Sequence, residues 1–564
     1  MAKKDISSGE IAARGKGLLV SSVLVYGISN ILTKVIGLFF KIPMNDLLGD
    51  AGMAYFNAAY SIYVLFYMIS TAGLPVAVSR LVAESRAQGR FKQVKKIYKL
   101  TLLLFFVIGA LGTGIMVLFS KQLAGNVDVK AQLCVIALAP TLFLVCLSSA
   151  FRGYFQGFRM LVPTGISQVL ESLGKLFVGL ILAKYAIALG KPMETVAAYG
   201  IFGITVGVLA GLLYLWLTKL CFKPQIYDVE YYSEFGEGGV DACESSGSII
   251  KMLAKIAVPI TVSSSVMSLA SLVDTFVMRP RLEHAGIAKE AAVELYGAYS
   301  TQCTSLFNLP PVLIYPVAYI IVPLVAECIA RKEKARMDSI LDSSFRLTAM
   351  IALPCAFGMS AIARYILPTL FNSESSLQMA PLLSVLSFAV FFMGVLATTN
   401  CALQAAGRES LPIFSMLAGV GVKLVASYVL CGIPSVAMYG TPISTVLCYA
   451  TAMMLNLYFV GKYVGFVPSV KKLFIRPVLS AGACGLVALV LSRLCEKVLF
   501  DGAASGRMEN ALITVISVFV AILVYAVLIF KFNAVTESDV KMLPKGEKIA
   551  SVLSRLHLLK RTDM

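Results

Sequence analysis

The sequence predicts an all-α integral membrane protein with about 14 transmembrane helices, forming two parallel six-helix lobes and two extra C-terminal helices. Three observations predict it: the composition, a series of long apolar runs and an internal repeat. Of the 564 residues, 58% are hydrophobic and 14% are charged, whereas soluble domains carry about 25% charged residues. A soluble chain this apolar could not cover its surface, so the apolar excess must face lipid.

The charge and the cysteines exclude other classes of protein. The net charge of +18 does not indicate a nucleic-acid partner, because the basic residues are spread over short loops between apolar runs, as membrane topology requires. Most of the twelve cysteines lie singly in apolar runs, and there are only two histidines. We therefore expect no metal site, and interpret the cysteines as small core residues.

The transmembrane helices are predicted from apolar runs of about 20 residues. The basic N-terminus lacks a small-residue cleavage site and is interpreted as leading into an uncleaved first helix. Pro310, Pro311 and Pro316 are expected to kink the long eighth run. The expected helices cover 17–43, 51–80, 98–120, 131–151, 161–186, 195–221, 249–278, 294–328, 341–366, 378–403, 410–432, 439–461, 474–498 and 510–531.

An even number of spans places both termini on one side of the membrane. The positive-inside rule makes that side the cytoplasm, because this orientation leaves most of the 49 Lys and Arg residues inside. We expect a multi-pass protein of the bacterial cytoplasmic membrane, with these cytoplasmic basic groups: 3–16, 80–99, 152–159, 219–255, 331–346, 408, 462–476 and the tail after 531. The expected divisions are an N-lobe (1–222), an acidic cytoplasmic linker (223–248), a C-lobe (249–465), two extra helices (466–532) and a tail (533–564).

An internal repeat supports the two lobes. GLPVAVSRLVAE ends at Glu84 and PVAYIIVPLVAE ends at Glu327, and each string is followed by a basic segment. A weaker match at nearly the same offset relates 151–163 to 401–412. Because the offset spans an even number of helices, the lobes should be parallel, as in transporters that bind substrate between repeats.

Lysines within the spans are candidate binding residues, because a charge in lipid is costly unless it is paired or faces a cavity. Lys34 lies too deep in the first span to reach the interface easily, so a cavity-facing role is expected. Lys41 lies nearer the end of that span and could instead extend to the interface. Lys175 and Lys423 occupy nearly equivalent places in the two halves of the sequence, which predicts a shared basic cavity.

Two acidic residues within the spans, Glu171 and Asp274, can each be interpreted in more than one way. Glu171 precedes Lys175 by four residues, a spacing that suits a salt bridge on one helix face, of structural or functional role. Asp274 could pair with a lysine or help to couple a cation. Arg279 and Arg281 follow at the outer mouth, as substrate-binding groups or as solvated loop charges.

Several cations in a cavity favour an anionic substrate, and a diphosphate is a good candidate because Lys and Arg bind phosphate oxygens through charge-assisted hydrogen bonds. The sequence has no GxxxxGK[ST], HExxH or GxSxG motif. We therefore expect neither an ATP-driven pump nor an enzyme, and no cofactor apart from a coupling ion such as Na⁺ or H⁺.

The segments GISNILTKVIGLFFKIPMNDLLG, RGYFQGFRMLVPTGISQVLE and NLPPVLIYPVAYIIVPLVAE resemble the polysaccharide-biosynthesis and stage V sporulation protein B family. This family belongs to the multidrug/oligosaccharidyl-lipid/polysaccharide exporter superfamily, and the resemblance covers about 17–530. It implies the two-lobe fold of multidrug exporters and MurJ-like lipid II flippases. It also implies flipping of undecaprenyl-diphosphate-linked sugars, lipid II first, for cell-wall synthesis or sporulation, with membrane lipids and cell-wall synthesis enzymes as partners.

The sequence departs from the lipid II flippases at two places. Those proteins usually carry arginines in the first and eighth spans, whereas this chain has Lys34 at the first place and no arginine in YGAYSTQCTSLFNLPP. Lysine does not reproduce the bidentate hydrogen bonds of arginine. Two alternatives stay open: a cation-coupled multidrug exporter using Glu171 and Asp274, and a membrane scaffold that recruits cell-wall enzymes through the acidic linker.

Overall fold

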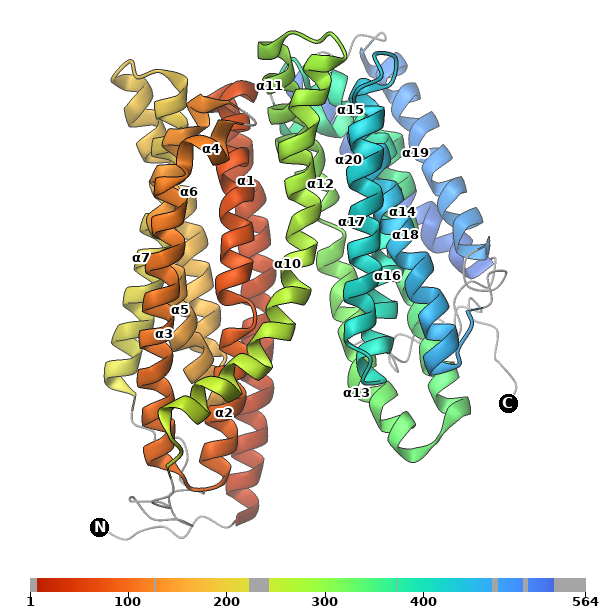
Figure 1. The fold of residues 1–564 in the computed structure, drawn as a ribbon. Coiled ribbons are helices and arrows are strands. Elements are labelled where there is room, and N and C mark those ends of the chain that lie inside the picture. The colour runs from red at the N-terminus through yellow and green to blue at the C-terminus, as the bar shows by residue number, and fades with distance from the viewer. Residues whose placement is uncertain are drawn as a thin grey trace. The chain divides into compact units, whose positions relative to one another are not determined.

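The computed structural model describes residues 8–125, 128–222, 243–371, 373–468, 475–500 and 506–531, and every regular element in these ranges is helical. The chain forms two compact units (Figure 1). The first unit holds the described residues up to Leu272, except Gly49–Ala51, which group with the second unit. The fold class expected from composition is therefore confirmed.

The first unit consists of α1 to α7 and the beginning of α10 (Figure 1). Its helices are α1 (Ser8–Thr71), α2 (Leu74–Ala87), α3 (Phe91–Leu118), α4 (Ser120–Gly125), α5 (Gln132–Gly157), α6 (Val162–Ala188), α7 (Met193–Cys221) and part of α10 (Ser246–His284). Here α7 packs along both α5 and α6, and α3 packs against α5.

The second unit contains the rest of α10 and the helices that follow it. They are α11 (Lys289–Ala298), α12 (Thr304–Phe307), α13 (Pro311–Arg331), α14 (Lys334–Leu370), α15 (Ser376–Leu386), α16 (Ala389–Ala405), α17 (Ser410–Leu430), α18 (Gly440–Phe459), α19 (Arg476–Phe500) and α20 (Arg507–Lys531). The two C-terminal helices both pack on α14. One of their shared cores joins Ile362, Cys484 and Ala521.

Twelve helices in the described ranges are long and apolar enough to cross a membrane, compared with about 14 expected. The first two expected spans are joined in α1, which bends at Gly49 (φ 62°, ψ −179°). This left-handed backbone is accessible almost only to glycine. The expected span 294–328 is divided among α11, α12 and α13, with a break at Asn308–Pro310. Because prolines lack the N–H of a helix interior, α13 begins at Pro311.

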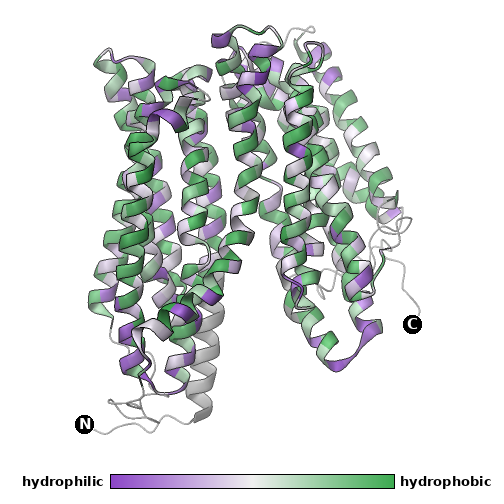
Figure 2. Ribbon diagram, in the orientation of Figure 1, coloured by the Kyte–Doolittle hydropathy of each residue, from purple (hydrophilic) through white to green (hydrophobic). Residues whose placement is uncertain are grey.

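Apolar side chains cover the outside of both units. Figure 2 shows hydrophobic residues along the helices and hydrophilic residues gathered toward the helix ends and connections. Large exposed side chains include Leu111, Ile181, Leu486 and Val515, each more than half exposed. A soluble protein would leave such an apolar surface in water, so the chain is a multi-pass membrane protein.

The beginning of α10 packs in the first unit. The backbone N–H of Gly73, between α1 and α2, donates to the Thr261 hydroxyl on α10 over 3.2 Å. The unit boundary therefore falls within α10, at Leu272, and not before this helix as the expected division at 223–248 implied. The interfacial helix that we expect in the tail and most of the linker, 223–242, lie outside the described residues.

The repeat predicted from the sequence agrees with the helix bounds. Glu84 lies one turn before the end of α2, and Glu327 lies one turn before the end of α13. Lys175 and Lys423 stand at the same distance from the first residues of α6 and α17, which are Val162 and Ser410. The two halves of the sequence therefore place these lysines on corresponding helices.

Close backbone contact between α6 and α7 positions α6. A Cβ atom built on Gly207 of α7 would lie 2.4 Å from the carbonyl oxygen of Glu171, and one on Gly174 of α6 would lie 2.4 Å from the Gly207 Cα. Small residues let membrane helices approach this closely, and dispersion contacts then hold them together. The packing of α6 therefore depends on the absence of side chains at this crossing.

We expect Gly207→Ala to destabilise the protein by about 1–3 kcal/mol, because the added methyl group overlaps the α6 backbone. Gly114→Ala in α3 is the matched control, since nothing lies within 4 Å of its Cβ position, and it should stabilise its helix by about 0.5–1 kcal/mol. Denaturant unfolding in detergent micelles measures both. Equal stabilities of the two variants would contradict the close packing of α6 on α7.

Candidate functional site

A buried ion pair joins α5 to α6 in the first unit. The Arg152 guanidinium donates to Glu171 Oε1 through Nη2 and to the Ser167 hydroxyl through Nε, the latter over 3.3 Å. The Arg152 side chain is 9% exposed and the Glu171 side chain is 18% exposed. Two charges this far from solvent stabilise each other and remove the cost of an isolated charge.

This pair corrects two expectations. The i,i+4 pair between Glu171 and Lys175 is not formed, because the carboxylate is bound by Arg152. Arg152 itself was assigned to a cytoplasmic loop at 152–159, whereas it lies in α5 and is 7% exposed. The reason is that α5 continues to Gly157, beyond the expected end at 151.

Lys175 contacts aromatic rings instead of an acid. Its Nζ lies 4.6 Å from the centroid of the Phe40 ring and 5.1 Å from that of Tyr60. Cation–π attraction partly offsets the removal of the ammonium group from water. Among the described residues, no acidic side chain lies within salt-bridge distance of Lys175, so its charge is not neutralised within the first unit.

Lys34, Lys41 and Lys175 form a lysine cluster in the first unit. Both α1 lysines lie close enough to Lys175 for electrostatic repulsion. Lys34 is exposed, and Lys41 and Lys175 are half-buried. None of the three forms an ion pair with another described residue. The structure thus brings together three lysines that the sequence placed on two expected helices.

An aromatic stripe, comprising Phe40, Phe56, Tyr60, Tyr63 and Tyr67, runs along α1 beside these charges. Successive ring centroids from Phe40 to Tyr67 lie 5.8, 6.5, 6.0 and 5.9 Å apart. Its far end interacts electrostatically with the Arg152–Glu171 pair. The stripe therefore connects the lysine cluster to the buried ion pair.

Sequence reasoning missed the aromatic stripe and Arg152. The spacing of Phe56, Tyr60, Tyr63 and Tyr67 is four, three and four residues, which is one face of a helix. That periodicity could have identified the face. No pattern in the sequence pairs Arg152 with Glu171, because the contact joins two different helices.

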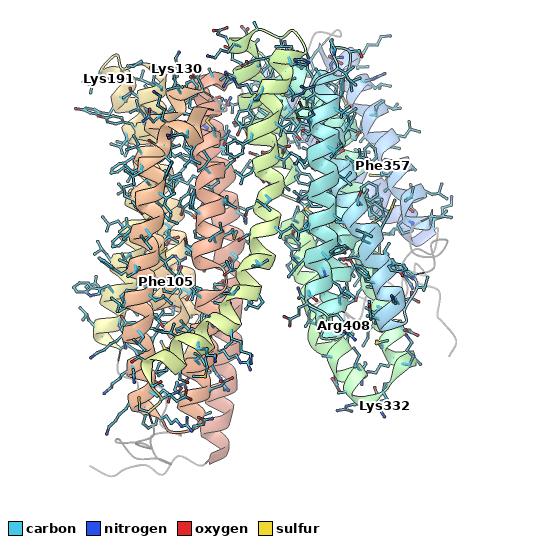
Figure 3. All side chains as sticks on the ribbon, in the orientation of Figure 1. Phe105, Lys130, Lys191, Lys332, Phe357 and Arg408 are labelled. Atoms are coloured by element: carbon cyan, nitrogen blue, oxygen red, sulfur yellow. The ribbon has the colours of Figure 1, made fainter. Side chains whose placement is uncertain are left out.

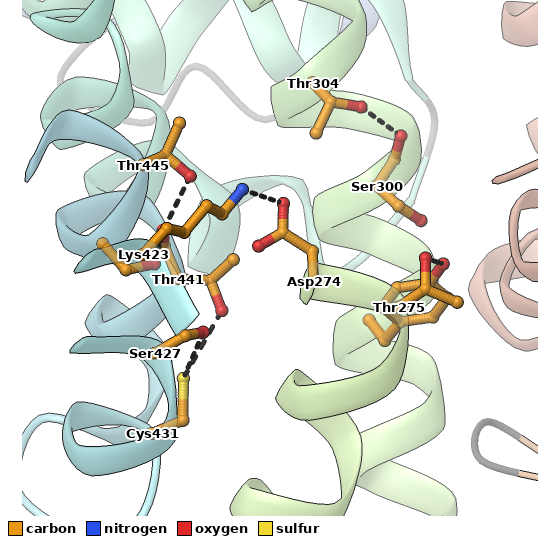
Figure 4. Close-up of polar contacts among 11 residues, drawn as sticks. Asp274, Thr275, Ser300, Thr304, Lys423, Ser427, Cys431, Thr441 and Thr445 are labelled. Carbon is orange, nitrogen blue, oxygen red and sulfur yellow. Dashed lines mark hydrogen bonds and ion pairs between the residues drawn. The ribbon is translucent and has the colours of Figure 1, made fainter. Parts of the chain in front are cut away.

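The second unit contains its own buried ion pair, between Asp274 of α10 and Lys423 of α17. Lys423 Nζ donates to Asp274 Oδ2 over 2.8 Å (Figure 4). The two side chains are 3% (Lys423) and 15% (Asp274) exposed. Of the two interpretations left open for Asp274, the structure shows pairing with a lysine. Asp274 Oδ1 is buried and has no hydrogen-bond partner.

Polar side chains surround this pair. Figure 4 shows Ser427 of α17 and Thr441 and Thr445 of α18 on the Lys423 side of the pair, and Thr275 of α10 directed away from it. The Thr275 hydroxyl lies 3.0 Å from the hydroxyl of Tyr296, and Cys431 Sγ lies 3.5 Å from the Thr441 hydroxyl. These hydroxyl and thiol groups form hydrogen bonds with one another. Asp274 Oδ1, beside the ion pair, is left without a hydrogen-bond donor.

Arg279 and Arg281 lie in α10 and not in a loop at the outer mouth. Arg279 is 7% exposed, and its Nε donates to Glu283 over 2.7 Å. Arg281 Nε donates to the Tyr428 carbonyl over 2.8 Å, and its guanidinium lies 4.1 Å from the centroid of that ring. Neither arginine is a loop charge, because α10 extends to His284, and Arg279 is also buried.

The labelled charges in Figure 3 gather at the ends of each unit. Lys130 and Lys191 lie at the same end of the first unit, and Lys332 and Arg408 lie at one end of the second. The topology predicted from the basic residues placed the first two outside and the last two in the cytoplasm. In agreement with this, Lys130 and Lys191 share one end of the first unit, and Lys332 and Arg408 share one end of the second.

We expect Lys423→Met to destabilise the protein by about 3–5 kcal/mol, because it leaves the Asp274 carboxylate buried without its partner. The double variant Asp274→Asn/Lys423→Met should recover much of that loss, since no unpaired charge remains. Denaturant unfolding in micelles of the two single variants and the double variant measures the coupling. Additive losses would show that the two side chains do not interact.

The comparisons with known proteins agree with this architecture. The family model described as "Polysaccharide biosynthesis protein" matches residues 19–329. Stage V sporulation protein B of Bacillus subtilis (strain 168) is 22% identical over 531 residues, covering 94% of this chain and 98% of that protein.

Two solved structures show the same fold. A multidrug resistance MATE family transporter of the MOP superfamily, in an inward-facing conformation, has a TM-score of 0.63 at 14% identity, over 77% of this chain and 98% of that one. Lipid II flippase MurJ, in an inward closed conformation, has a TM-score of 0.60 at 13% identity, over 90% and 98%. The resemblance noted in the sequence is thereby confirmed.

With more than half of its length matched, the chain belongs to the polysaccharide biosynthesis protein family, and its fold is that of the MOP superfamily transporters.

Proposed function

We propose that the protein is an alternating-access flippase. It moves an undecaprenyl-diphosphate-linked glycan, with lipid II as the leading candidate, from the inner to the outer leaflet of the bacterial cytoplasmic membrane. Both termini are cytoplasmic in this proposal. The observation that carries it is the lysine cluster of Lys34, Lys41 and Lys175, which has no acidic partner among the described residues.

The lysine cluster favours an anionic substrate on electrostatic grounds. Like charges at close range repel, and a charge within a membrane protein costs several kcal/mol unless something compensates it. A diphosphate brings negative charge and several acceptor oxygens into the cluster at once, and lysine ammonium groups bind such oxygens well. The lipid chain of the substrate can remain in the bilayer while its head group is bound.

The aromatic stripe supports a glycan beside the diphosphate. Tyr60, Tyr63 and Tyr67 provide phenolic hydroxyl groups that can donate to and accept from sugar hydroxyls. Their rings follow one another from the one beside Lys175, with Tyr60 and Tyr67 half-buried and Tyr63 buried. A substrate with an anionic group next to polar sugars matches this sequence of cations and tyrosines along α1.

The main alternative is a cation-coupled multidrug exporter, which the fold shared with a MATE transporter favours. Such a protein presents acidic groups to cationic drugs. Glu171 and Asp274 are the acids expected for that purpose, and each is already paired with a buried cation, Arg152 or Lys423. The lysine cluster, which pairs with no described acid, is positively charged. A positive site favours an anionic substrate, and therefore the flippase.

Ion coupling belongs to the same proposal. A charge that crosses the membrane field gains or loses about 2.3 kcal/mol per 100 mV, so the membrane potential can drive head-group release. Asp274 Oδ1 is an open, buried acceptor next to Lys423, and Na⁺ or H⁺ binding there would weaken the ion pair. The Asp274–Lys423 pair is therefore the proposed coupling element.

Flipping of fluorescent lipid II by the purified protein in proteoliposomes tests the function, with an ion gradient or a potential imposed. We expect protein-dependent appearance of lipid II in the opposite leaflet. Lys34→Gln and Lys175→Gln should each lower the initial rate by about tenfold or more, since each removes a charge-assisted hydrogen bond to the diphosphate.

Lys130→Gln and Lys191→Gln are the matched controls, because both lysines are exposed at one end of the first unit (Figure 3). These variants should flip lipid II at the wild-type rate. Unchanged rates in the folded Lys34→Gln and Lys175→Gln variants would refute the cationic site. Absence of translocation under every gradient would direct attention to another undecaprenyl-linked glycan, and then to drug export.

A further inference from the structure

A pocket of about 500 Å³ lies in the second unit, among α14, α15 and α19. Its size falls in the range of small-molecule sites, about 300–1,000 Å³. The lining includes Arg364 and Ser360 of α14, Leu377 and Ser384 of α15, and Leu489 and Arg493 of α19. Figure 1 shows these three helices within the second unit. None of these residues belongs to the site described above.

The pocket carries a net positive charge. Arg364 Nη2 lies 3.8 Å from Glu496 Oε1, which is a long contact, and Glu496 Oε2 accepts a hydrogen bond from the Tyr365 hydroxyl over 2.7 Å. Arg493 forms no hydrogen bond or ion pair with another described residue. Two guanidinium groups against one carboxylate leave about one unit of positive charge, which matches a phosphodiester.

Two serines, Ser360 and Ser384, also line the pocket. The Ser384 hydroxyl donates to the Ser360 carbonyl oxygen over 2.9 Å and so ties α15 to α14. No hydrogen bond joins the Ser360 hydroxyl to any other described group. It is therefore free to donate to an oxygen of an anion bound in the pocket that the two arginines also line.

The pocket opens on the lipid side of the second unit. Leu377 is 58% exposed, and Leu486, Val490 and Leu494 form an exposed stripe along α19 beside Arg493. Arg364 and Arg493 each lie about 10 Å from the end of their helix, at a rise of 1.5 Å per residue. Both arginines therefore lie in the last third of their helices, nearer to the head groups than to the middle of a bilayer about 30 Å thick.

From these contacts we propose that the α14–α15–α19 pocket binds the phosphate group of a membrane lipid. Arg364 and Arg493 hold the phosphate oxygens, Ser360 donates a third hydrogen bond, and Leu377 and Leu489 contact the start of the lipid chain. The lipid phosphate is a phospholipid phosphodiester or a polyprenyl phosphate. Two arginines extending separately to water would not need to share a pocket with a free hydroxyl group.

Native mass spectrometry of the full-length protein in detergent tests this proposal. The protein is titrated with phosphatidylglycerol, with zwitterionic phosphatidylcholine and with undecaprenyl phosphate. We expect one tightly retained anionic lipid, and at least about tenfold weaker retention of phosphatidylcholine. Arg364→Gln/Arg493→Gln should lower the affinity for the anionic lipid by about tenfold or more, and Arg364→Lys/Arg493→Lys should lower it less.

Arg331→Gln/Arg336→Gln is the matched control, because it removes two exposed arginines at the opposite end of α13 and α14 from the pocket. It should retain lipid like the wild type. Tighter binding of undecaprenyl phosphate than of phosphatidylglycerol would identify the carrier lipid as the ligand, and equal binding would identify bulk lipid. Equal retention by the wild type and the glutamine variant, both with wild-type thermal unfolding, would overturn the proposal. This readout does not involve flipping, so it is independent of the proposed function.

Discussion

The cost of an uncompensated charge inside a bilayer governs the polar interior of this protein. In each of the two units, a buried ion pair between two helices removes the cost of leaving its two charges isolated. Arg152 and Glu171 connect α5 to α6, and Asp274 and Lys423 connect α10 to α17. Once these four groups neutralise each other, the lysine cluster on α1 and α6 stands out as a group of three positive charges that form no ion pair with a described acid. In the proposed function, a ligand that supplies negative charge compensates it.

Helix packing determines where these charged side chains lie. In a membrane, the association of helices depends on close contact and not on hydrophobic burial. Gly174 and Gly207 let α6 and α7 touch through their backbones, and this contact carries Glu171 toward Arg152 and Lys175 toward Phe40 and Tyr60. The bend at Gly49 separates the part of α1 that bears the two lysines and Phe40 from the part that bears the rest of the aromatic stripe. The positions of the charged side chains therefore depend on these three glycines as well as on the charged residues themselves.

The C-terminal helices give the second unit a surface of a different character. Because α19 and α20 pack on α14, they add lipid-facing area that a six-helix lobe would lack. The arginine pocket lies at that added junction, away from the Asp274–Lys423 pair. Substrate recognition and contact with individual lipids can thus occur at separate places in one chain.

Much of this protein could be predicted from the sequence alone. Apolar run length and composition reflect the thickness and polarity of the bilayer, so the helices, the membrane location and the repeat were predictable from residue order. The position of Lys34, Lys175, Glu171, Asp274 and Lys423 within spans was also visible, and it marked them as candidates because ionisable residues are rare there. What tertiary structure alone decided was which of them pair. The i,i+4 rule suggested Lys175 for Glu171, yet the extension of α5 to Gly157 brought Arg152 to that carboxylate. Pairing between helices depends on crossing geometry, which is set by backbone contacts far apart in sequence, and no local spacing encodes it.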